Sequence, residues 1–311
     1  MQEREPFIFG KGWVHSREVM YFYGATRAMG EADEFESVVL RWERGKWGLW
    51  QIGTRLCSVV TTAYTGPRTV ICTGIDGYVE VSDGKSRHVE AIDRSKDGPN
   101  RLNHVTSVRP IGEQVFAVGM SRMVYARHAQ GSWHRMDDGV RIPRESLEID
   151  GLKAIEGDGR GTLVAVGLRG GIWVWETGPW RSVVSPTNIK LEALRWLNGA
   201  LYIAGGGGLL LRGQPDVLEI VHQTATEDAF WSMESYRGEL YLATRRGSLW
   251  KLVGDDLERV ELPGSPDVTT GWLHSNDDVL LSVGERDLFV YDGKDWTRVP
   301  PPADAVWPFE W

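Results

Sequence analysis

The sequence has few of the features that assign a chemistry or a compartment directly. Its 311 residues include only two cysteines, Cys57 and Cys72, which is too few for a disulfide framework. We expect both to be small buried apolar residues, with a bridge between them as the less favoured alternative. No run of about 18 apolar residues is present, so no membrane span is expected. Residues 1–6 lack the basic start of a signal peptide, and we therefore expect a cytoplasmic protein.

An excess of basic charge is also missing. The formal net charge is −8 and the isoelectric point is near 5.5. Nonspecific binding to nucleic acid or to an anionic membrane requires a basic surface, so neither partner is expected. The acidity is compatible with a basic protein partner, and solubility alone is the simpler interpretation.

Sequence motifs for catalysis and for cofactor binding are absent as well. The chain has no phosphate-binding loop, no His-Glu-x-x-His and no pair of Cys-x-x-Cys motifs, so spacing indicates neither a nucleotide site nor a zinc site. The seven histidines are scattered along the chain. We therefore predict no catalytic residue and no cofactor.

What the sequence does contain is a pattern that recurs seven times at intervals of about 40 residues. A short apolar run ends in glycine or a substitute for it, and a turn and a second apolar run follow. The terminal residues of the first runs are Gly24, Gly74, Gly119, Gly167, Gly205, Thr244 and Gly284. Short strands repeated at this period are typical of a β-propeller. We predict an all-β chain in which residues 1–311 form a single closed propeller of seven four-stranded blades. Six blades is the alternative, if the irregular first repeat completes the last blade.

The repeat also predicts which strands lie nearest the axis and which tryptophans fill the spaces between blades. Inner strands are expected at residues 56–61, 105–108, 152–155, 191–196, 230–233 and 268–272. Trp47, Trp133, Trp180 and Trp296 occupy equivalent places in the expected outer strands. A large flat side chain at such a place is suited to packing between two twisted sheets, and we prefer this role to ligand stacking.

Three segments depart from the repeat and are the candidate partner-binding regions. Residues 25–35 include Glu31, Asp33 and Glu34, and residues 137–150 include Glu145 and Glu148. Loops on a rigid scaffold often carry binding residues, although a solvated acidic loop is the alternative. The C-terminal tail places Trp307 and Trp311 after three consecutive prolines. We expect this tail to pack on the first blade, with a partner contact as the other possibility.

The spacing of Val-Gly, a turn, an apolar strand and then tryptophan resembles the repeats of bacterial propellers of the WD40, kelch and BNR groups. The resemblance covers nearly the whole chain, but its motifs are incomplete. Residues 291–296 approach an Asp box without its serine, Gly-Gly pairs occur in only two repeats, and no blade ends in Trp-Asp. The resemblance implies the propeller architecture and no single family.

These observations favour a non-catalytic protein-binding propeller, and in the sharper form an immunity protein that neutralises a bacterial toxin. Such a protein would be a monomer apart from its partner. The alternative is a hydrolase or lactonase with a metal site in the axial channel, for which His104, Glu192 and His274 are the candidate ligands. Propellers in such enzymes would draw single ligands from several inner strands. Metal analysis of the purified protein would separate the two functions.

Overall fold

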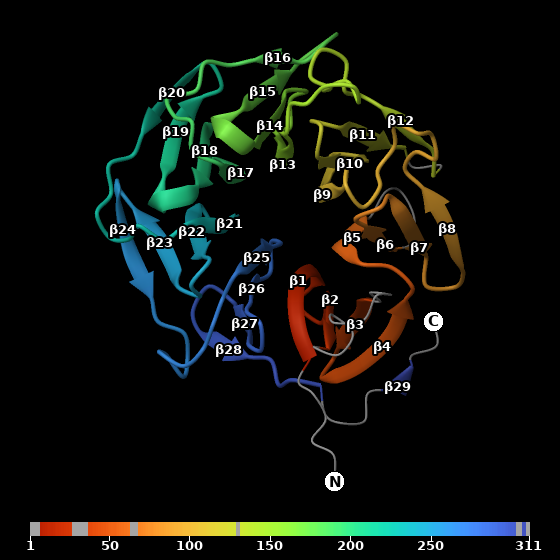
Figure 1. The fold of residues 1–311 in the computed structure, drawn as a ribbon. Helices are drawn as coiled ribbons and strands as arrows, with labels where there is room; N and C mark the ends of the chain where they lie inside the picture. The colour runs from red at the N-terminus through yellow and green to blue at the C-terminus, as the bar shows by residue number, and fades with distance from the viewer. Residues whose placement is uncertain (1–6, 27–36, 63–67, 129–130, 303–306, 309–311) are drawn as a thin grey trace.

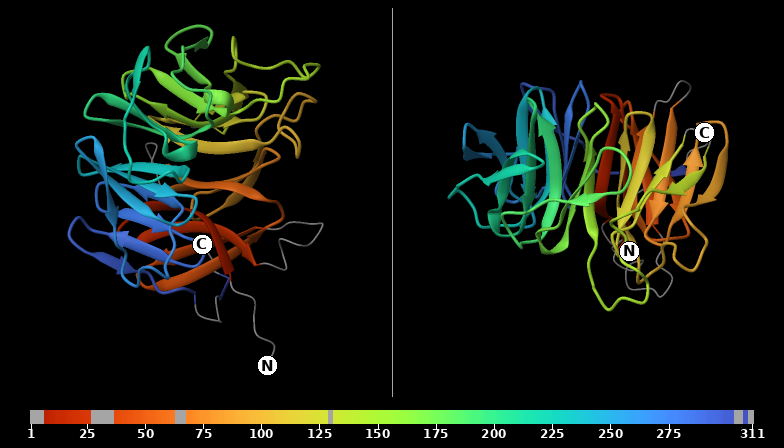
Figure 2. Two further views of the ribbon diagram at one scale, coloured as in Figure 1. Left: turned by 60° about the vertical axis from the view of Figure 1, so that its left-hand side comes forward. Right: turned by 90° about the horizontal axis from the view of Figure 1, so that it is seen from above.

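The computed structural model describes residues 7–26, 37–62, 68–128, 131–302 and 307–308. They form seven antiparallel sheets arranged as the blades of a ring (Figure 1). Seen edge-on, the blades stand side by side around one axis (Figure 2). Two short 3-10 turns, Leu168–Gly170 and Gly206–Gly208, are the only helical elements in these ranges. The predicted all-β propeller of seven blades is confirmed.

Each blade contributes four strands in chain order from the axis outward. The inner strands are β1 (Phe7–Ser16), β5 (Leu56–Thr62), β9 (Val105–Ile111), β13 (Leu152–Gly157), β17 (Leu191–Leu197), β21 (Phe230–Tyr236) and β25 (Trp272–Ser275). The second strands are β2 (Val19–Thr26), β6 (Thr69–Gly74), β10 (Gln114–Gly119), β14 (Leu163–Gly167), β18 (Ala200–Gly205), β22 (Glu239–Thr244) and β26 (Leu280–Val283).

The two remaining positions carry shorter strands in most blades, and the outer strands are the most exposed. The third strands are β3 (Ser37–Glu43), β7 (Tyr78–Ser82), β11 (Val124–Arg127), β15 (Ile172–Trp175), β19 (Leu210–Gln214), β23 (Leu249–Val253) and β27 (Leu288–Tyr291). The outer strands are β4 (Lys46–Ile52), β8 (Arg87–Ala91), β12 (Trp133–Arg135), β16 (Arg181–Ser182), β20 (Val217–Ile220), β24 (Asp256–Val260) and β28 (Trp296–Arg298).

One expected inner strand is wrong in its position. Residues 268–271 precede the seventh blade, and β25 begins only at Trp272. The approach to the axis is made by a turn, in which the Asp287 carboxylate accepts a hydrogen bond from the Thr269 amide at 3.0 Å. An amide used in this way is not available to a strand ladder.

The repeated glycine is explained by a close approach of two backbones. A Cβ atom on Gly167 would lie 2.0 Å from the carbonyl oxygen of Gly151, and one on Gly119 would lie 2.3 Å from that of His104. These oxygens belong to the residue that enters the neighbouring inner strand. A side chain at this place would therefore push the inner strand out of register with the second strand, which is why the sequence repeat ends in glycine.

The first repeat is a blade of its own, and the ring closes between it and the seventh blade. The Val14 amide donates to Nδ1 of His274 at 3.0 Å, and Nε1 of Trp272 donates to the Gly12 carbonyl at 3.2 Å. A shared apolar cluster that includes Phe22 and Leu281 fills the space between these two blades. The tail adds a short strand, β29 (Trp307–Pro308), parallel to β4 at the outer edge of the first blade. Seven blades, rather than six, is the observed arrangement.

The core lies between the blades, as the tryptophan positions predict. Trp180 is 3% exposed and packs in a cluster formed by the third and fourth blades. Trp47, Trp133 and Trp296 are partly buried against equivalent inter-blade clusters. Cys57 and Cys72 are both buried and free, which confirms their expected role as small core residues.

Candidate functional site

The inner strands enclose a cavity on the axis that opens at the face where these strands begin. Its volume is about 630 Å³, within the range of about 300 to 1,000 Å³ that is usual for ligand sites. The strand registers place one residue of each inner strand at the same level. This level consists of Lys11, Ser58, Ser107, Ala154, Ala193, Ser232 and Trp272. All seven residues line the cavity, which we call the axial cup.

A network of buried charges forms the floor of the axial cup, two residues further along the inner strands. Nε and one terminal nitrogen of Arg195 donate to the two carboxylate oxygens of Glu234 at 3.0 and 3.1 Å. Arg109 lies 2.8 Å from the Glu156 carboxylate and 3.6 Å from that of Glu234. Burial alone would raise the pKa of Glu234, but Arg195 and Arg109 outweigh it and hold that pKa at about 2. The four charges balance, so the floor is neutral overall.

His274 belongs to the same level of the floor. Its ring is 5% exposed and stacks on Trp13 with 3.6 Å between the ring centroids. Nδ1 accepts the hydrogen bond from the Val14 amide, which requires that nitrogen to be unprotonated. Burial lowers the pKa of His274 to about 3, although Glu234 acts in the opposite direction. The ring is therefore neutral at physiological pH and forms part of the closure between the first and last blades.

We expect the free energy of unfolding to decrease as the pH falls from about 6.5 to 3. The unfolded histidine has a pKa of about 6.5, so within this window the unfolded state binds a proton that folded His274 does not. Below about pH 4.3, the ordinary pKa of glutamate, Glu234 adds to the loss because its folded pKa is also lowered. His274→Asn should remove the part of the loss between about pH 6.5 and 4.5. Urea melts at a series of pH values measure this, with His222→Asn, at an exposed position, as the control. An unchanged pH dependence in His274→Asn would contradict the assignment.

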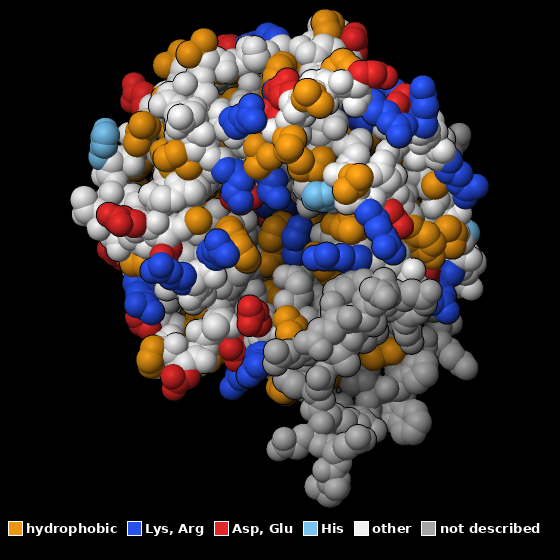
Figure 3. All heavy atoms as spheres, viewed as in Figure 1, with side chains coloured by type: hydrophobic (Ala, Val, Ile, Leu, Met, Phe, Trp, Pro, Cys, Tyr) orange, Lys and Arg blue, Asp and Glu red, His pale blue; other side chains and the backbone are white. Residues whose placement is uncertain are grey.

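The rim of the axial cup is basic, although the protein as a whole is acidic. The lining of the whole cup includes seven Lys or Arg side chains and two Glu side chains, and two of the seven, Arg109 and Arg195, belong to the neutral floor. The charged side chains of the lining are Lys11, Arg109, Lys153, Lys190, Arg195, Arg245 and Arg246, against Glu192 and Glu285. Lys and Arg side chains gather around the central opening in the face view (Figure 3). The local charge at this opening is thus opposite in sign to the net charge of −8.

Exposed apolar side chains occur on the same face. The connections that lead into inner strands carry Leu102 (91% exposed), Leu147 (98%), Ile149 (71%) and Ile189 (41%). Trp231, 44% exposed, lies at the start of β21 and lines the axial cup. The guanidinium of Arg245 lies 5.6 Å from the centre of its ring. Apolar side chains held in water around an opening are typical of a surface that a partner covers.

The segment 137–150 is tied to its neighbours rather than simply solvated. Arg141 pairs with Asp137 at 3.1 Å, and Arg144 donates to the Lys96 carbonyl at 3.0 Å. Arg122 pairs with Asp150 at 2.6 Å and also with Glu148. These contacts present Leu147 and its neighbours in a defined position.

The sequence-predicted site residues lie in different places. Glu145 is exposed, and Glu148 is partly exposed in its pair with Arg122. The backbone of Trp307 pairs with Gly48 at the outer edge of the first blade, as expected for the tail. Glu31, Asp33, Glu34 and Trp311 lie outside the described residues.

The three candidate metal ligands have different surroundings in the structure. Glu192 pairs with Lys190, and with Lys153 at 3.9 Å. His274 serves the blade closure described above, and His104 is partly buried beside the start of β9. Within the part of the chain that the structure describes, no group of three or more His, Cys, Asp or Glu side chains is placed to hold a metal ion. Neither described helical turn is long or apolar enough to span a membrane.

The basic rim was missed at the level of the sequence. Apart from the adjacent Arg245 and Arg246, its members are single residues far apart in the chain, so no long local run of charge marks them. An alignment of the repeats would have given a signal, because Lys11 and Trp272 occupy the place of small residues in the other blades.

Comparison with known proteins connects the chain to an immunity function. Over 298 residues it is 28% identical to the immune protein Tsi7 of Pseudomonas aeruginosa, a match that covers 93% of this chain and 95% of that protein. No protein-family model matches the chain. The similarity supports the predicted immunity protein, and the propeller fold fits protein binding.

Solved structures with similar folds have very different sequences. A puromycin-hydrolyzing peptidase of Mycobacterium tuberculosis superposes with a TM-score of 0.71 at 13% identity; the match covers 96% of this chain but only 53% of that longer enzyme. The WD40 propeller domain of Doa1 gives 0.68 at 10% identity, with 93% of each chain covered. YCF48 from Cyanidioschyzon merolae gives 0.64 at 14%, covering 93% of this chain and 96% of that one. These likenesses establish the propeller architecture only.

Proposed function

We propose that this protein is an immunity protein that binds a toxin protein and holds it inactive. The observation that carries the proposal is the similarity to an immune protein along nearly the full length of both chains. A match of that extent spans far more than a single repeat. A preformed ring also limits the ordering cost of binding, because described segments such as 137–150 are already tied to their neighbours.

The face at which the inner strands begin is the proposed toxin-binding surface. It combines the basic rim with the exposed side chains of Leu147, Ile149 and Trp231. Buried aromatic and aliphatic anchors usually determine the lifetime of a protein complex. The outer strands offer mainly isolated apolar residues such as Val89 and Val217.

Three finer statements belong to the same proposal. The net charge of −8 favours a partner whose overall charge is basic, since opposite net charges speed association. We further propose that the chain is a monomer apart from this partner and that it acts in the cytoplasm. Affinity purification from the native source, with mass spectrometry of the co-purified proteins, tests the first of these, and a preparation that contains no stoichiometric partner would count against the proposal.

If the acidic segments guide a basic partner, reversing their charge should slow association. Glu31, Asp33 and Glu145 changed together to Lys should lower the association rate by about tenfold or more at low salt, while the free energy of unfolding should stay nearly constant, as is usual for single charges outside the core. The matched control reverses Glu219, Glu258 and Asp295, three exposed acids on or beside outer strands, with the same change in net charge. Surface plasmon resonance at two salt concentrations measures both variants. Equal association rates for the two triple variants would show that the acidic segments contribute no more to association than other exposed acids do.

A further inference from the structure

The axial cup contains more positive than negative charge even after its internal pairs are counted. Arg109 and Arg195 are balanced by Glu156 and Glu234 in the floor. Lys153 and Lys190 share a single carboxylate, that of Glu192. Arg246 lies 3.3 Å from Asp228 at the rim. Lys11 has no carboxylate partner among the described residues, and Arg245 stacks on Trp231 instead. Even with the exposed Glu285 counted, the cup is left with uncompensated cations.

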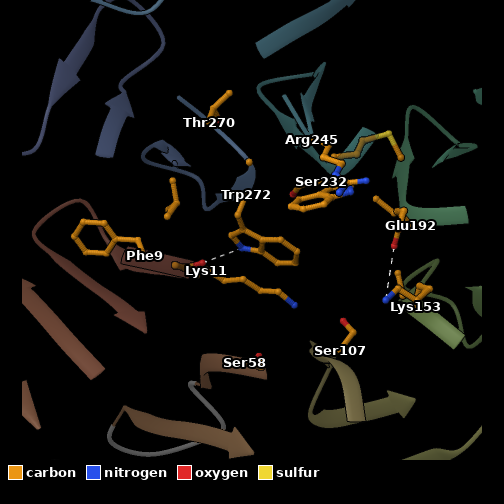
Figure 4. Close-up of a pocket in the computed structure, with 18 of the residues that line it drawn as sticks. Phe9, Lys11, Ser58, Ser107, Lys153, Glu192, Ser232, Arg245, Thr270 and Trp272 are labelled. Carbon is orange, nitrogen blue, oxygen red and sulfur yellow. Dashed lines mark hydrogen bonds and ion pairs between the residues drawn. The ribbon is translucent and has the colours of Figure 1, made fainter. Parts of the chain in front are cut away.

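Lys11 is the most informative of these cations. Its side chain extends across the axial cup from β1 (Figure 4), and its ammonium lies 4.4 Å from the centre of the Trp272 ring. Burial in the cup and the nearby charge of Lys153 lower the pKa of Lys11, while Glu192 and Cys57 act in the opposite direction. Lys11 is half-buried, and an ammonium partly withdrawn from water is stabilised by an accompanying anion.

Hydroxyl groups stand at the same level as Lys11. Ser58, Ser107 and Ser232 come from three different blades and face the axial cup (Figure 4). Ser232 is buried, and its oxygen accepts the hydrogen bond of the Leu273 amide at 3.0 Å, which leaves its hydroxyl hydrogen as a donor. One ammonium together with several hydroxyl donors is a set that a carboxylate, which only accepts hydrogen bonds, can satisfy.

We propose that the axial cup receives a carboxylate-bearing segment of the protein partner, with Lys11 as its principal counter-charge. This inference rests on the proposed function, because it names the chemistry of the contact that the partner makes. A protein segment is favoured over a free small molecule by the surroundings of the opening. Trp231 and Ile189 are exposed beside the cup, and a partner that inserts an acidic side chain would cover them at the same time. This is consistent with the basic partner proposed above, because a protein with a net positive charge can still carry one acidic segment.

A titration with defined peptides tests this inference without the partner. Hexaglutamate, hexalysine and citrate are titrated separately into the purified full-length protein at low salt, and the heat of binding is measured. We expect hexaglutamate to bind and hexalysine to give no heat, even though the protein is acidic overall. Lys11→Met should weaken hexaglutamate binding by about tenfold or more, the usual order for losing a charged hydrogen bond. Lys294→Met, which removes an 87% exposed lysine in a turn of the seventh blade, should bind as the wild type does.

Each outcome decides the inference. Hexaglutamate binding that depends on Lys11 supports it. Binding of citrate alone would overturn it in favour of a free small anion, and hexaglutamate binding that is unaffected by Lys11→Met would place the contact elsewhere. If Lys11→Met does not fold, Arg245→Gln at the exposed rim takes its place with the same expectation. A toxin that co-purifies with a chain that does not bind hexaglutamate would overturn this inference alone and leave the immunity function standing.

Discussion

Trp180→Ala should lower the free energy of unfolding by about 3 to 5 kcal/mol, the usual loss for deleting a buried large aromatic side chain. Trp180 is 3% exposed in the cluster between the third and fourth blades. Its Nε1 also donates to the Met136 carbonyl at 2.6 Å, so the truncation leaves that oxygen without its partner. Urea denaturation followed by fluorescence or circular dichroism measures the change.

Trp231→Ala is the matched control for this measurement. It makes the same chemical change at a position that is 44% exposed, where substitutions usually alter stability by less than about 1 kcal/mol. Similar losses for the two variants would mean that packing between blades is not what makes Trp180 important. Trp133 and Trp296, which are only partly buried, should give values between these two.

Arg195→Met should also cost about 3 to 5 kcal/mol of unfolding free energy, because it leaves a buried carboxylate without its counter-charge. The Glu234 carboxylate is bound by Arg195 through two hydrogen bonds, and Arg109 is 3.6 Å away. Once Arg195 is removed, the pKa of Glu234 should rise toward and above its ordinary value, since burial then acts against fewer positive charges. The loss should therefore be smaller at pH 4 than at pH 7.

An exposed ion pair provides the comparison for Arg195. Arg181 of β16 lies 2.6 Å from Asp216 in the turn between β19 and β20, with both side chains largely in water. Removing it by Arg181→Met should cost no more than about 1 kcal/mol, as is usual for surface pairs. If Arg195→Met also costs no more than about 1 kcal/mol, the buried charges of the floor do not stabilise the fold more than an exposed pair does.

The repeat in the sequence was sufficient to predict the ring, the number of blades and most strands. Its period corresponds to one four-stranded blade, and its terminal glycines follow from the backbone approach seen at Gly119 and Gly167. The start of β25 was not predicted; just before it, the Thr269 amide bonds the carboxylate of Asp287, 18 residues away. The residues next to Thr269 in the sequence do not indicate such a contact.

The site was less accessible to sequence reasoning than the fold. The acidic segments stood out because their charges are adjacent in the chain, and Glu145 is indeed exposed. The axial cup collects Lys11, Lys153 and Arg245 from blades that are far apart in the sequence. Only the closure of the ring brings these residues to one opening. Their combined positive charge therefore cannot be predicted until the register of each inner strand is known.

The central claim is that this chain protects a cell from a toxin by binding it. The most direct measurement is the growth of a heterologous bacterial host that produces the co-purified partner, with and without this chain. The account predicts that the partner alone stops growth, that the wild-type chain restores it, and that a chain changed at the opening of the axial cup, with Trp231→Glu and Lys11→Glu, restores it less or not at all. A partner that is harmless by itself, or growth that is equally poor with and without the wild-type chain, would contradict the account.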